Sequence, residues 1–228
     1  MTTFFVTGID TDIGKSIVTG LLARFLRSTK VNYITAKLIQ TGCKDIAEDI
    51  ITHRKIEGIE LLPEDRAKKT CPYTFKFPAS PHLAAEMEGC AIDPAHIAKC
   101  VNKLAESYDC VLLEGAGGLM VPLSRDLLAA DFIAEQNYSL IVVSSARLGS
   151  INHTLLTLEA ALNRNIPIAG VVYNEYPQEK SAIAEDSKSI INNWLKSHKI
   201  NAPLIPSPHV RDLNNPPTID FSGIFNDK

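Results

Sequence analysis

One stretch decides the fold, and it reads Gly8-Ile-Asp-Thr-Asp-Ile-Gly14-Lys15-Ser16. A short apolar run, Phe4–Val6, precedes it, and residues 15–28 carry the apolar stripe of an amphipathic helix. A glycine-rich loop between a strand and a helix turns backbone N–H groups toward a phosphate. The order of elements therefore predicts a phosphate-binding loop, although five residues separate Gly8 from Gly14 where the standard motif has four.

Lys15 and Ser16 follow the loop at the positions that give such loops their chemistry. The lysine would reach the β- and γ-phosphates, and the serine hydroxyl would ligate Mg²⁺. The alternative is a turn glycine beside an exposed lysine, which the flanking strand and helix disfavour. Asp10 and Asp12 are unusual because carboxylates repel phosphate. They either keep the loop soluble or face a cation such as a substrate amine.

Short apolar runs alternate with helical patterns along the rest of the chain. We expect strands at Tyr33–Ile39, Cys110–Leu113, Leu140–Val143, Ile168–Tyr173 and Pro203–Ile205, and helices near 46–56, from Asp93-Pro94, over 151–164 and over 181–197. Strands without polar alternation are typical of a sheet covered by helices on both faces. The pattern predicts a single P-loop NTPase-like α/β domain over residues 1–228, with a mostly parallel sheet and an irregular proline-rich tail from about residue 206.

Composition narrows the class of protein. The chain has 228 residues, of which 45% are hydrophobic and 21% charged, as in an ordinary globular domain. A net charge of −3 disfavours a nucleic-acid partner, and no apolar run approaches the roughly 18 residues of a membrane span. The start MTTFFVTG does not resemble a signal peptide. Five cysteines without a CxxC pair predict free thiols in a reducing cytoplasm and no zinc site.

Further charged side chains fall where strands are expected to end. Lys37 lies near the end of the second predicted strand and either neutralises a transferring phosphoryl group or reaches solvent at the sheet rim. Glu114 follows the strand Cys110–Leu113 and either reaches Mg²⁺ or is a solvated acid in a glycine-rich turn. An acidic cluster after the second strand is a solvated helix face or supplies one more metal ligand, and it consists of Asp45, Glu48 and Asp49.

Several patterns beyond the loop occur together and in order. They are Lys37 with Thr41-Gly42, Pro72-Tyr-Thr-Phe75, Ser80-Pro-His82, Glu114-Gly-Ala-Gly-Gly118, Leu148-Gly-Ser-Ile-Asn-His153 and Asn174. With the phosphate-binding loop and its longer spacing, this set resembles the dethiobiotin synthetases over about residues 1–205. The Pro-Tyr-Thr-Phe and Gly-x-Ile-Asn-His patterns are specific to that family, whereas many relatives share the loop.

The resemblance implies a reaction and its partners. The expected enzyme is a cytoplasmic homodimer that uses ATP and Mg²⁺ in biotin biosynthesis. One amine of 7,8-diaminopelargonate takes up CO₂ to form a carbamate, and ATP phosphorylates that carbamate. The other amine then closes the ureido ring, which gives dethiobiotin, ADP and phosphate.

The resemblance also implies a role for each matched residue. Lys37, Lys15 and Thr11 would act on the carbamate and the transferring phosphoryl group. The nucleotide would be bound by Asp12, Ile13, Gly14, Lys15, Ser16, Ile17 and Asn174. The substrate would be bound by Thr41, Gly115, Ala116, Gly117 and Gly118, and by Ser150, Ile151 and Asn152 of the partner subunit. Mg²⁺ would be held by Ser16, Asp49 and Glu114.

The chain departs from the family pattern at three places. Asp12 stands where the family often has glutamate, and Ser16 where threonine is commoner. The segment Ala202–Pro208 lacks the glycine of the loop that frames adenine, which predicts weak selection of the nucleotide base. The alternative functions are a ParA/MinD-like ATPase switch, disfavoured by Ile9-Asp10 in place of an early lysine, and a small-molecule kinase, disfavoured by sparse arginine.

Overall fold

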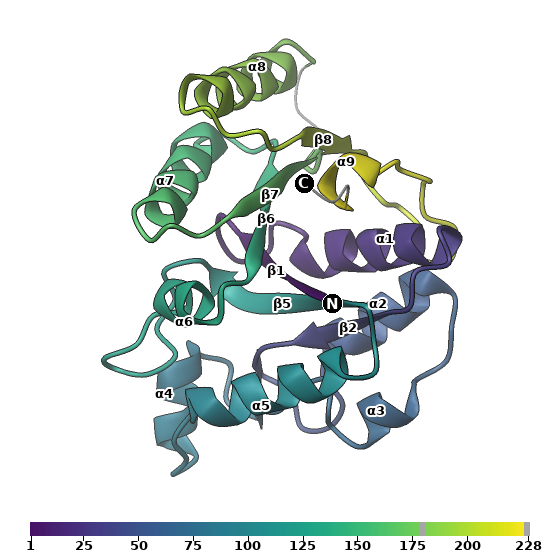
Figure 1. Cartoon of the computed structure of the whole chain (residues 1–228), viewed down its shortest axis with the longest axis vertical. Coiled ribbons are helices and arrows are strands. Elements are labelled where there is room, and N and C mark those ends of the chain that lie inside the picture. Colours follow the sequence, from purple (N-terminus) through teal and green to yellow (C-terminus); the bar gives the residue numbers. More distant parts are fainter. Residues whose placement is uncertain (178–180, 226–228) are drawn as a thin grey trace.

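The computed structural model describes residues 1–177 and 181–225 and has an α/β fold. Its main sheet has six parallel strands in the order β2-β5-β1-β6-β7-β8. These are β1 (Thr2–Gly8), β2 (Tyr33–Lys37), β5 (Cys110–Gly118), β6 (Ser139–Ser145), β7 (Ile168–Asn174) and β8 (Leu204–Ser207). Figure 1 shows them following one another from β2 in the lower half of the view to β8 in the upper half. The prediction of a mostly parallel sheet is confirmed.

Helices flank this sheet. Those that the sequence predicted are α1 (Lys15–Ser28), α2 (Glu48–Glu57), α5 (Pro94–Ala105), α7 (Ser150–Leu162) and α8 (Ser181–Ser197). Those that it did not predict are α3 (Pro63–Arg66), α4 (Pro81–Met87), α6 (Ala129–Gln136) and α9 (Ser222–Phe225). The second group has only four to eight residues per helix, too few to show a clear apolar period. In Figure 1, α1 and α9 lie to the right of the central strands and α6 and α7 to the left.

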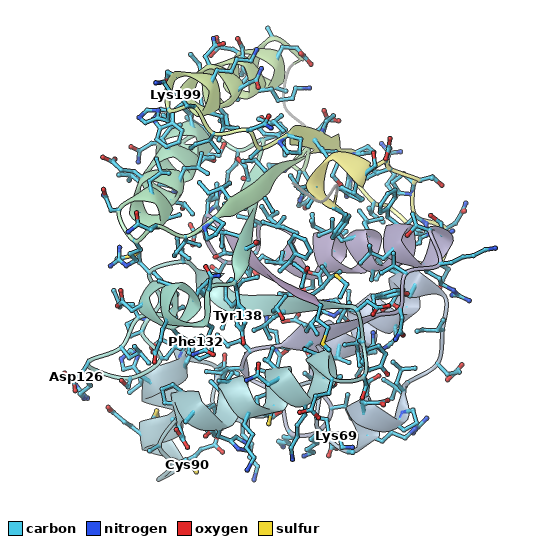
Figure 2. All side chains as sticks on the ribbon, viewed as in Figure 1. Lys69, Cys90, Asp126, Phe132, Tyr138 and Lys199 are labelled. Atoms are coloured by element: carbon cyan, nitrogen blue, oxygen red, sulfur yellow. The ribbon has the colours of Figure 1, made fainter. Side chains whose placement is uncertain are left out.

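The central strands are buried on both faces. Residues 4–8 of β1 and 140–145 of β6 are buried without a break. Side chains of a strand point alternately to the two faces, so unbroken burial requires a cover on each face. Figure 2 shows Phe132 and Tyr138 inside the ribbon, whereas Asp126 and Lys199 lie at its periphery. The first two rings meet edge to face with centroids 6.2 Å apart.

All six strands of the main sheet differ in length from the predicted runs, and the differences in β2 and β5 bear on the site. β2 ends at Lys37 rather than Ile39, because the chain then enters β3 (Gln40–Thr41), which pairs with β4 (Thr74–Phe75). β5 continues past Leu113 through the glycine-rich stretch. These glycines therefore form the carboxyl end of a central strand.

The C-terminal tail packs against α1 and β7. Phe221 is fully buried, and its ring meets Phe25 of α1 edge to face at 6.0 Å. Ile224 of α9 lies on Gly170 of β7, where an added Cβ would come within 2.8 Å of its side chain. The tail thus covers one end of the core, although it is largely irregular. Within residues 1–177 and 181–225, no helix is long and apolar enough to cross a membrane.

Candidate active site

The phosphate-binding loop lies between β1 and α1 and is held by β7. Gly14 has a φ of 90°, a left-handed conformation that favours glycine, and an added Cβ there would come within 2.4 Å of the Asn174 amide nitrogen. That amide donates a hydrogen bond to the Ile13 carbonyl at 2.8 Å. α1 starts directly at Lys15 and has no acidic residue in its first turn. Its first N–H groups and its dipole therefore suit an anion.

Lys15 reaches back over this loop. The residue is 8% exposed, and its Nζ donates to the Asp10 carbonyl at 2.9 Å. Burial, followed by the positive charge of Lys37, lowers the pKa of Lys15. An ammonium group in such surroundings gains from a nearby anion, which fits a bound phosphate.

A polar cluster lies at the carboxyl edge of the main sheet and consists of Ser16, Lys37, Asp49 and Glu114. Lys37 Nζ lies 2.5 Å from Asp49 Oδ2 and 2.9 Å from Glu114 Oε1. The Ser16 hydroxyl lies 2.7 Å from Asp49 Oδ1 and 3.0 Å from Glu114 Oε1. The register of β2 and β5 sets Lys37 beside Glu114, and α2 brings Asp49 to them.

Burial and charge oppose each other in this cluster. Burial alone would lower the pKa of Lys37, but the Glu114 and Asp49 carboxylates outweigh it and raise that pKa. Burial would raise the pKa of Glu114, but the charge of Lys37 and a hydrogen bond with His53 bring it well below its ordinary value. Lys37 and Glu114 are 4% and 0% exposed, so neither is a solvated group at the sheet rim.

His53 belongs to the same cluster and was not predicted from the sequence. Its Nε2 lies 2.6 Å from Glu114 Oε2, and its Nδ1 has no hydrogen-bond partner among the described residues. His53 follows Asp49 by one turn of α2, so the two side chains share a helix face. The spacing of four residues between Asp49 and His53 was the one sequence feature that could have indicated that His53 lies at the site. The contact fixes the direction of the Glu114 carboxylate.

Asp10 faces a cation that the chain itself supplies. Its Oδ2 pairs with Arg147 Nη2 at 2.5 Å, and its Oδ1 accepts the Thr11 N–H at 2.7 Å. The Thr11 hydrogen bond lowers the pKa of Asp10, burial partly opposes it, and the charge of Arg147 adds to the lowering. The pair ties the phosphate-binding loop to the segment between β6 and α7. Asp12 is exposed, has a φ of 54° and lines the cavity described next.

A cavity of about 600 Å³ joins the loop and the cluster. Many of the predicted site residues line it, namely Thr11, Asp12, Gly14, Lys15, Ser16, Ile17, Lys37, Thr41, Asp49, Glu114, Ala116, Gly117 and Asn174. Ile13, Gly115 and Gly118 adjoin these residues in the chain but are not part of its lining. Other lining residues were not predicted from the sequence, among them Gln40, Thr52, Tyr176, His209 and Val210. The last three follow β7 and β8 in segments with no periodic pattern, so the sequence held no signal for them.

Ser150, Ile151 and Asn152 lie apart from this cavity. They open α7 after Gly149, whose φ is 90°. Ser150 and Ile151 line a separate depression of about 350 Å³. Within one chain the structure therefore does not bring this turn together with Lys15 and Lys37.

The cluster offers the kind of oxygen groups that Mg²⁺ takes in nucleotide sites. Within the described part of the chain, no group of three or more His, Cys, Asp and Glu side chains could hold a metal by itself. Mg²⁺ is usually held by one or two carboxylates together with substrate phosphates. Ser16, Asp49 and Glu114 fit a metal that binds together with a nucleotide.

Comparisons with known sequences reveal relatives that cover most of the chain. Residues 2–205 match a family model described as an AAA domain. The chain is 55% identical to ATP-dependent dethiobiotin synthetase BioD 2 of Haemophilus influenzae, over 76% of this chain and 91% of that one. It is 50% identical to ATP-dependent dethiobiotin synthetase BioD of Chlorobaculum tepidum, over 88% and 84%. It is 47% identical to ATP-dependent dethiobiotin synthetase BioD 2 of Pasteurella multocida, over 87% and 93%.

Solved structures share the fold at low sequence identity. The pNOB8 ParA protein bound to nonspecific DNA has a TM-score of 0.56 at 14% identity, covering 90% of this chain and 79% of that one. The MinD cell division protein of Aquifex aeolicus has a TM-score of 0.53 at 14% identity, covering 93% and 84%. These two likenesses show a P-loop fold and nothing of function. The sequence relatives and the motifs agree, and the chain belongs to the dethiobiotin synthetase family.

Proposed function

We propose that this chain is an ATP-dependent ligase that converts 7,8-diaminopelargonate and CO₂ to dethiobiotin, releasing ADP and phosphate. Its relatives are named ATP-dependent dethiobiotin synthetases. One observation carries the proposal: Lys15 and Lys37 line the same cavity beside a phosphate-binding loop. Phosphoryl transfer requires positive charge held at the transferring group, and this arrangement supplies it.

The first step joins a substrate amine to CO₂. The nitrogen lone pair forms the C–N bond, and the nitrogen gives up a proton. An alkylamine resembles lysine, whose pKa is about 10.4, so it is largely protonated at neutral pH. Lys15 and Lys37 would lower the pKa of an amine bound beside them, because like charges disfavour its protonated form, whereas the Asp49 and Glu114 carboxylates that pair with Lys37 would oppose this effect. Once the carbamate has formed, the same ammonium groups attract its negative charge.

The next two steps transfer and then release phosphate. A carbamate oxygen attacks the γ-phosphorus while the bond to the ADP oxygen breaks. Lys15 would contact the γ-phosphate, and Lys37 would contact the carbamate and the transferring group. The second amine then attacks the carbonyl carbon, and phosphate leaves with the electrons of the C–O bond. Thr11 and Thr41 line the same cavity and would hydrogen-bond the phosphoryl group and the carbamate.

A bound Mg²⁺ would neutralise charge on the β- and γ-phosphates. Ser16, Asp49 and Glu114 would hold it, since their oxygens converge. The two carboxylates also pair with Lys37. Lys37 therefore has to give up part of this pairing when it faces a carbamate.

We place the substrate carboxylate at the α7 turn of a partner subunit in a homodimer. Residues 150–152 open α7, and the N–H groups of such a turn suit a carboxylate. Leu148 beside this turn is 94% exposed. Met120 and Leu156 are also exposed, and they line a shallow groove that Asp10 lines as well. Burial of these apolar side chains against a second copy would stabilise a dimer.

We place the protein in the cytoplasm. All five cysteines are free thiols. Burial raises the pKa of Cys71 to about 11 and that of Cys110 to about 12, so both stay protonated and unreactive at neutral pH. Unpaired thiols of this kind persist in a reducing compartment.

The test follows nucleotide turnover by purified protein with Mg²⁺ and bicarbonate, with and without 7,8-diaminopelargonate, and identifies the ureido product by mass. We expect a product that disappears in Lys37→Ala. Arg125→Ala is the matched control, because Arg125 pairs with Glu86 and neither residue lines the cavity. Turnover that ignores the diamino acid and rises with DNA or lipid vesicles would support a ParA- or MinD-like switch instead. A phosphorylated product without ring closure would support a kinase.

A further inference from the structure

The cavity that holds the two lysines also has an aromatic wall. Tyr176 lies two residues after β7 and His209 two residues after β8, and both line the cavity. Their ring centroids are 4.5 Å apart and their planes are inclined by 33°. Two segments distant in sequence thus present a pair of touching rings, of which Tyr176 is 49% exposed.

The strand order separates this wall from the charged groups. Lys37 and Glu114 belong to β2 and β5 on one side of β1, whereas Tyr176 and His209 follow β7 and β8 on the other side. The phosphate-binding loop follows β1, between the two. A nucleoside triphosphate has the same order: the reacting phosphate, the inner phosphates, the sugar and a flat base. A nucleotide bound with its phosphates at Lys15 and its reacting phosphate toward Lys37 would extend its base toward the rings.

We propose that Tyr176 and His209 form the platform on which the nucleotide base stacks, and that stacking supplies most of the binding energy of the base. The inference deepens the proposed function and rests on it only for nucleotide binding. The two rings already touch, so a base lies on the open face of the pair rather than between them. Stacking on an aromatic face accepts every base, because each base has a π-face.

Two polar side chains that directly precede Tyr176 in the chain are partly engaged elsewhere. The Asn174 amide donates to the Ile13 carbonyl, which uses one of its two N–H groups. Glu175 is paired with Lys188 at 3.2 Å. Asn174 and Glu175, the two described polar residues that directly precede Tyr176, therefore have fewer groups free to read the edge of a base, and the platform gives a physical reason for weak base selection.

Calorimetric titration of the whole chain isolates the platform. The ligands are ADP, GDP, CDP and inorganic pyrophosphate, each with Mg²⁺. In Tyr176→Ala we expect the nucleotide Kd values to rise roughly fivefold to a hundredfold, the effect of losing one base–aromatic stack, while the pyrophosphate Kd stays unchanged. The affinity for ADP and GDP should fall more than that for CDP, because a purine has a larger face than a pyrimidine. Tyr176→Phe restores the affinity, and His209→Ala also raises the Kd values of the nucleotides.

His198 provides the matched control. It stacks on Trp194 with centroids 3.9 Å apart, and neither ring lines the cavity. His198→Ala should leave all four affinities unchanged. Unchanged nucleotide binding in Tyr176→Ala, an effect on ADP alone, or an equal loss for pyrophosphate would each overturn the platform. The titrations contain no diamino acid, so a failure to form dethiobiotin leaves their outcome intact and the two proposals are judged separately.

Discussion

Lys37 Nζ lies within 2.9 Å of carboxylate oxygens of both Asp49 and Glu114, and Glu114 also contacts His53. Lys37, Glu114 and His53 are almost completely withdrawn from water. Removing one partner of a buried ion pair leaves a charge without compensation, which costs about 3–5 kcal/mol. Lys37 is therefore needed for the stability of this edge of the sheet as well as for the proposed chemistry.

Lys37→Met should lower the free energy of unfolding by about 3 kcal/mol in the presence of a chelator. Mg²⁺ added together with ADP should raise the melting temperature of the variant more than that of the wild type. The reason is that the metal no longer competes with a lysine for Asp49 and Glu114. Thermal and urea unfolding with chelator, and with Mg²⁺ and ADP, would measure both effects.

Lys188→Met is the control for that experiment. Lys188 pairs with Glu175 and Glu185, which are partly exposed to solvent. Pairs of this kind contribute about 1 kcal/mol or less, so the control should unfold close to the wild type and respond to Mg²⁺ as the wild type does. Wild-type stability of Lys37→Met in chelator would show that the carboxylates do not depend on this lysine.

Some residues of the site could be placed from the sequence and others could not. Lys37 and Glu114 could be placed because each lies at or near the end of a predicted strand, and parallel strands end at one edge of a sheet. Asp10 could not be assigned, because its partner Arg147 is 137 positions away and only the fold brings them together. Tyr176 and His209 meet for the same reason.

Helices were predictable where their ends carried local signals. Asp93 caps α5 by accepting the Ala95 N–H at 2.9 Å, and Pro94 occupies the first turn, both as expected. α6 lacks such a cap: its N-cap residue is Leu128, and its eight residues are fixed by the burial of Phe132 and Ile133. Packing of this kind is a property of the fold and leaves no local pattern.

One arginine ties the helix that carries Asp49 and His53 to α3 and to the sheet. Arg54 of α2 donates to both Asp65 oxygens of α3, at 2.8 and 2.9 Å. It also donates to the Thr35 hydroxyl of β2 at 2.7 Å. Arg54 thus joins two helices to the sheet directly behind the polar cluster. Its loss would misplace the proposed metal ligand on α2.

Asp65→Asn should lower the free energy of unfolding by about 3 kcal/mol at neutral pH. Burial raises the pKa of Asp65, but the hydrogen bonds and charge of Arg54 outweigh it and hold the pKa below its ordinary value. The folded-state pKa then lies below the unfolded value of about 3.9. The stabilisation is therefore complete above that value and is lost as the pH falls through the folded-state pKa.

Urea unfolding at several pH values measures this dependence. The curves for wild type and Asp65→Asn should converge in acid. Asp131→Asn is the control, since Asp131 pairs with Arg164 in a partly exposed position and should contribute about 1 kcal/mol or less. A gap between wild type and Asp65→Asn that stays constant into acid would contradict the prediction.

The proposed division of labour follows from the sheet order of the whole molecule. β1 carries the phosphate-binding loop in the middle, with the lysine–carboxylate cluster on the side of β2 and β5 and the ring pair on the side of β7 and β8. The α7 turn is not part of this cavity. A pattern along one chain cannot reveal a site that needs two chains, so the homodimer rests on the family resemblance and on exposed apolar side chains such as Leu148.

Leu148→Asp should convert the proposed dimer to a monomer. A carboxylate at the centre of an apolar contact has to lose its water without gaining a partner. Sedimentation velocity at several protein concentrations would measure the shift. Met87→Asp is the control, because Met87 is exposed on α4, at the opposite end of the molecule from α7 and α8 (Figure 1). A wild type that sediments as a monomer at all concentrations would refute the dimer.

A mixing experiment tests whether two chains share one active site. Lys37→Ala disables the cavity of its own chain and keeps the α7 turn. Ile151→Asp keeps the cavity, stabilises the N-terminus of α7 and repels a substrate carboxylate at that turn. Each variant alone should form little dethiobiotin.

If the turn serves the partner, a mixed dimer has one intact site, formed by the cavity of the Ile151→Asp chain and the turn of the Lys37→Ala chain. An equal mixture that exchanges freely should then regain about a quarter of the wild-type activity. No regain after verified subunit exchange would place the turn with the cavity of its own chain, because in that case each chain of the mixed dimer keeps its own defect.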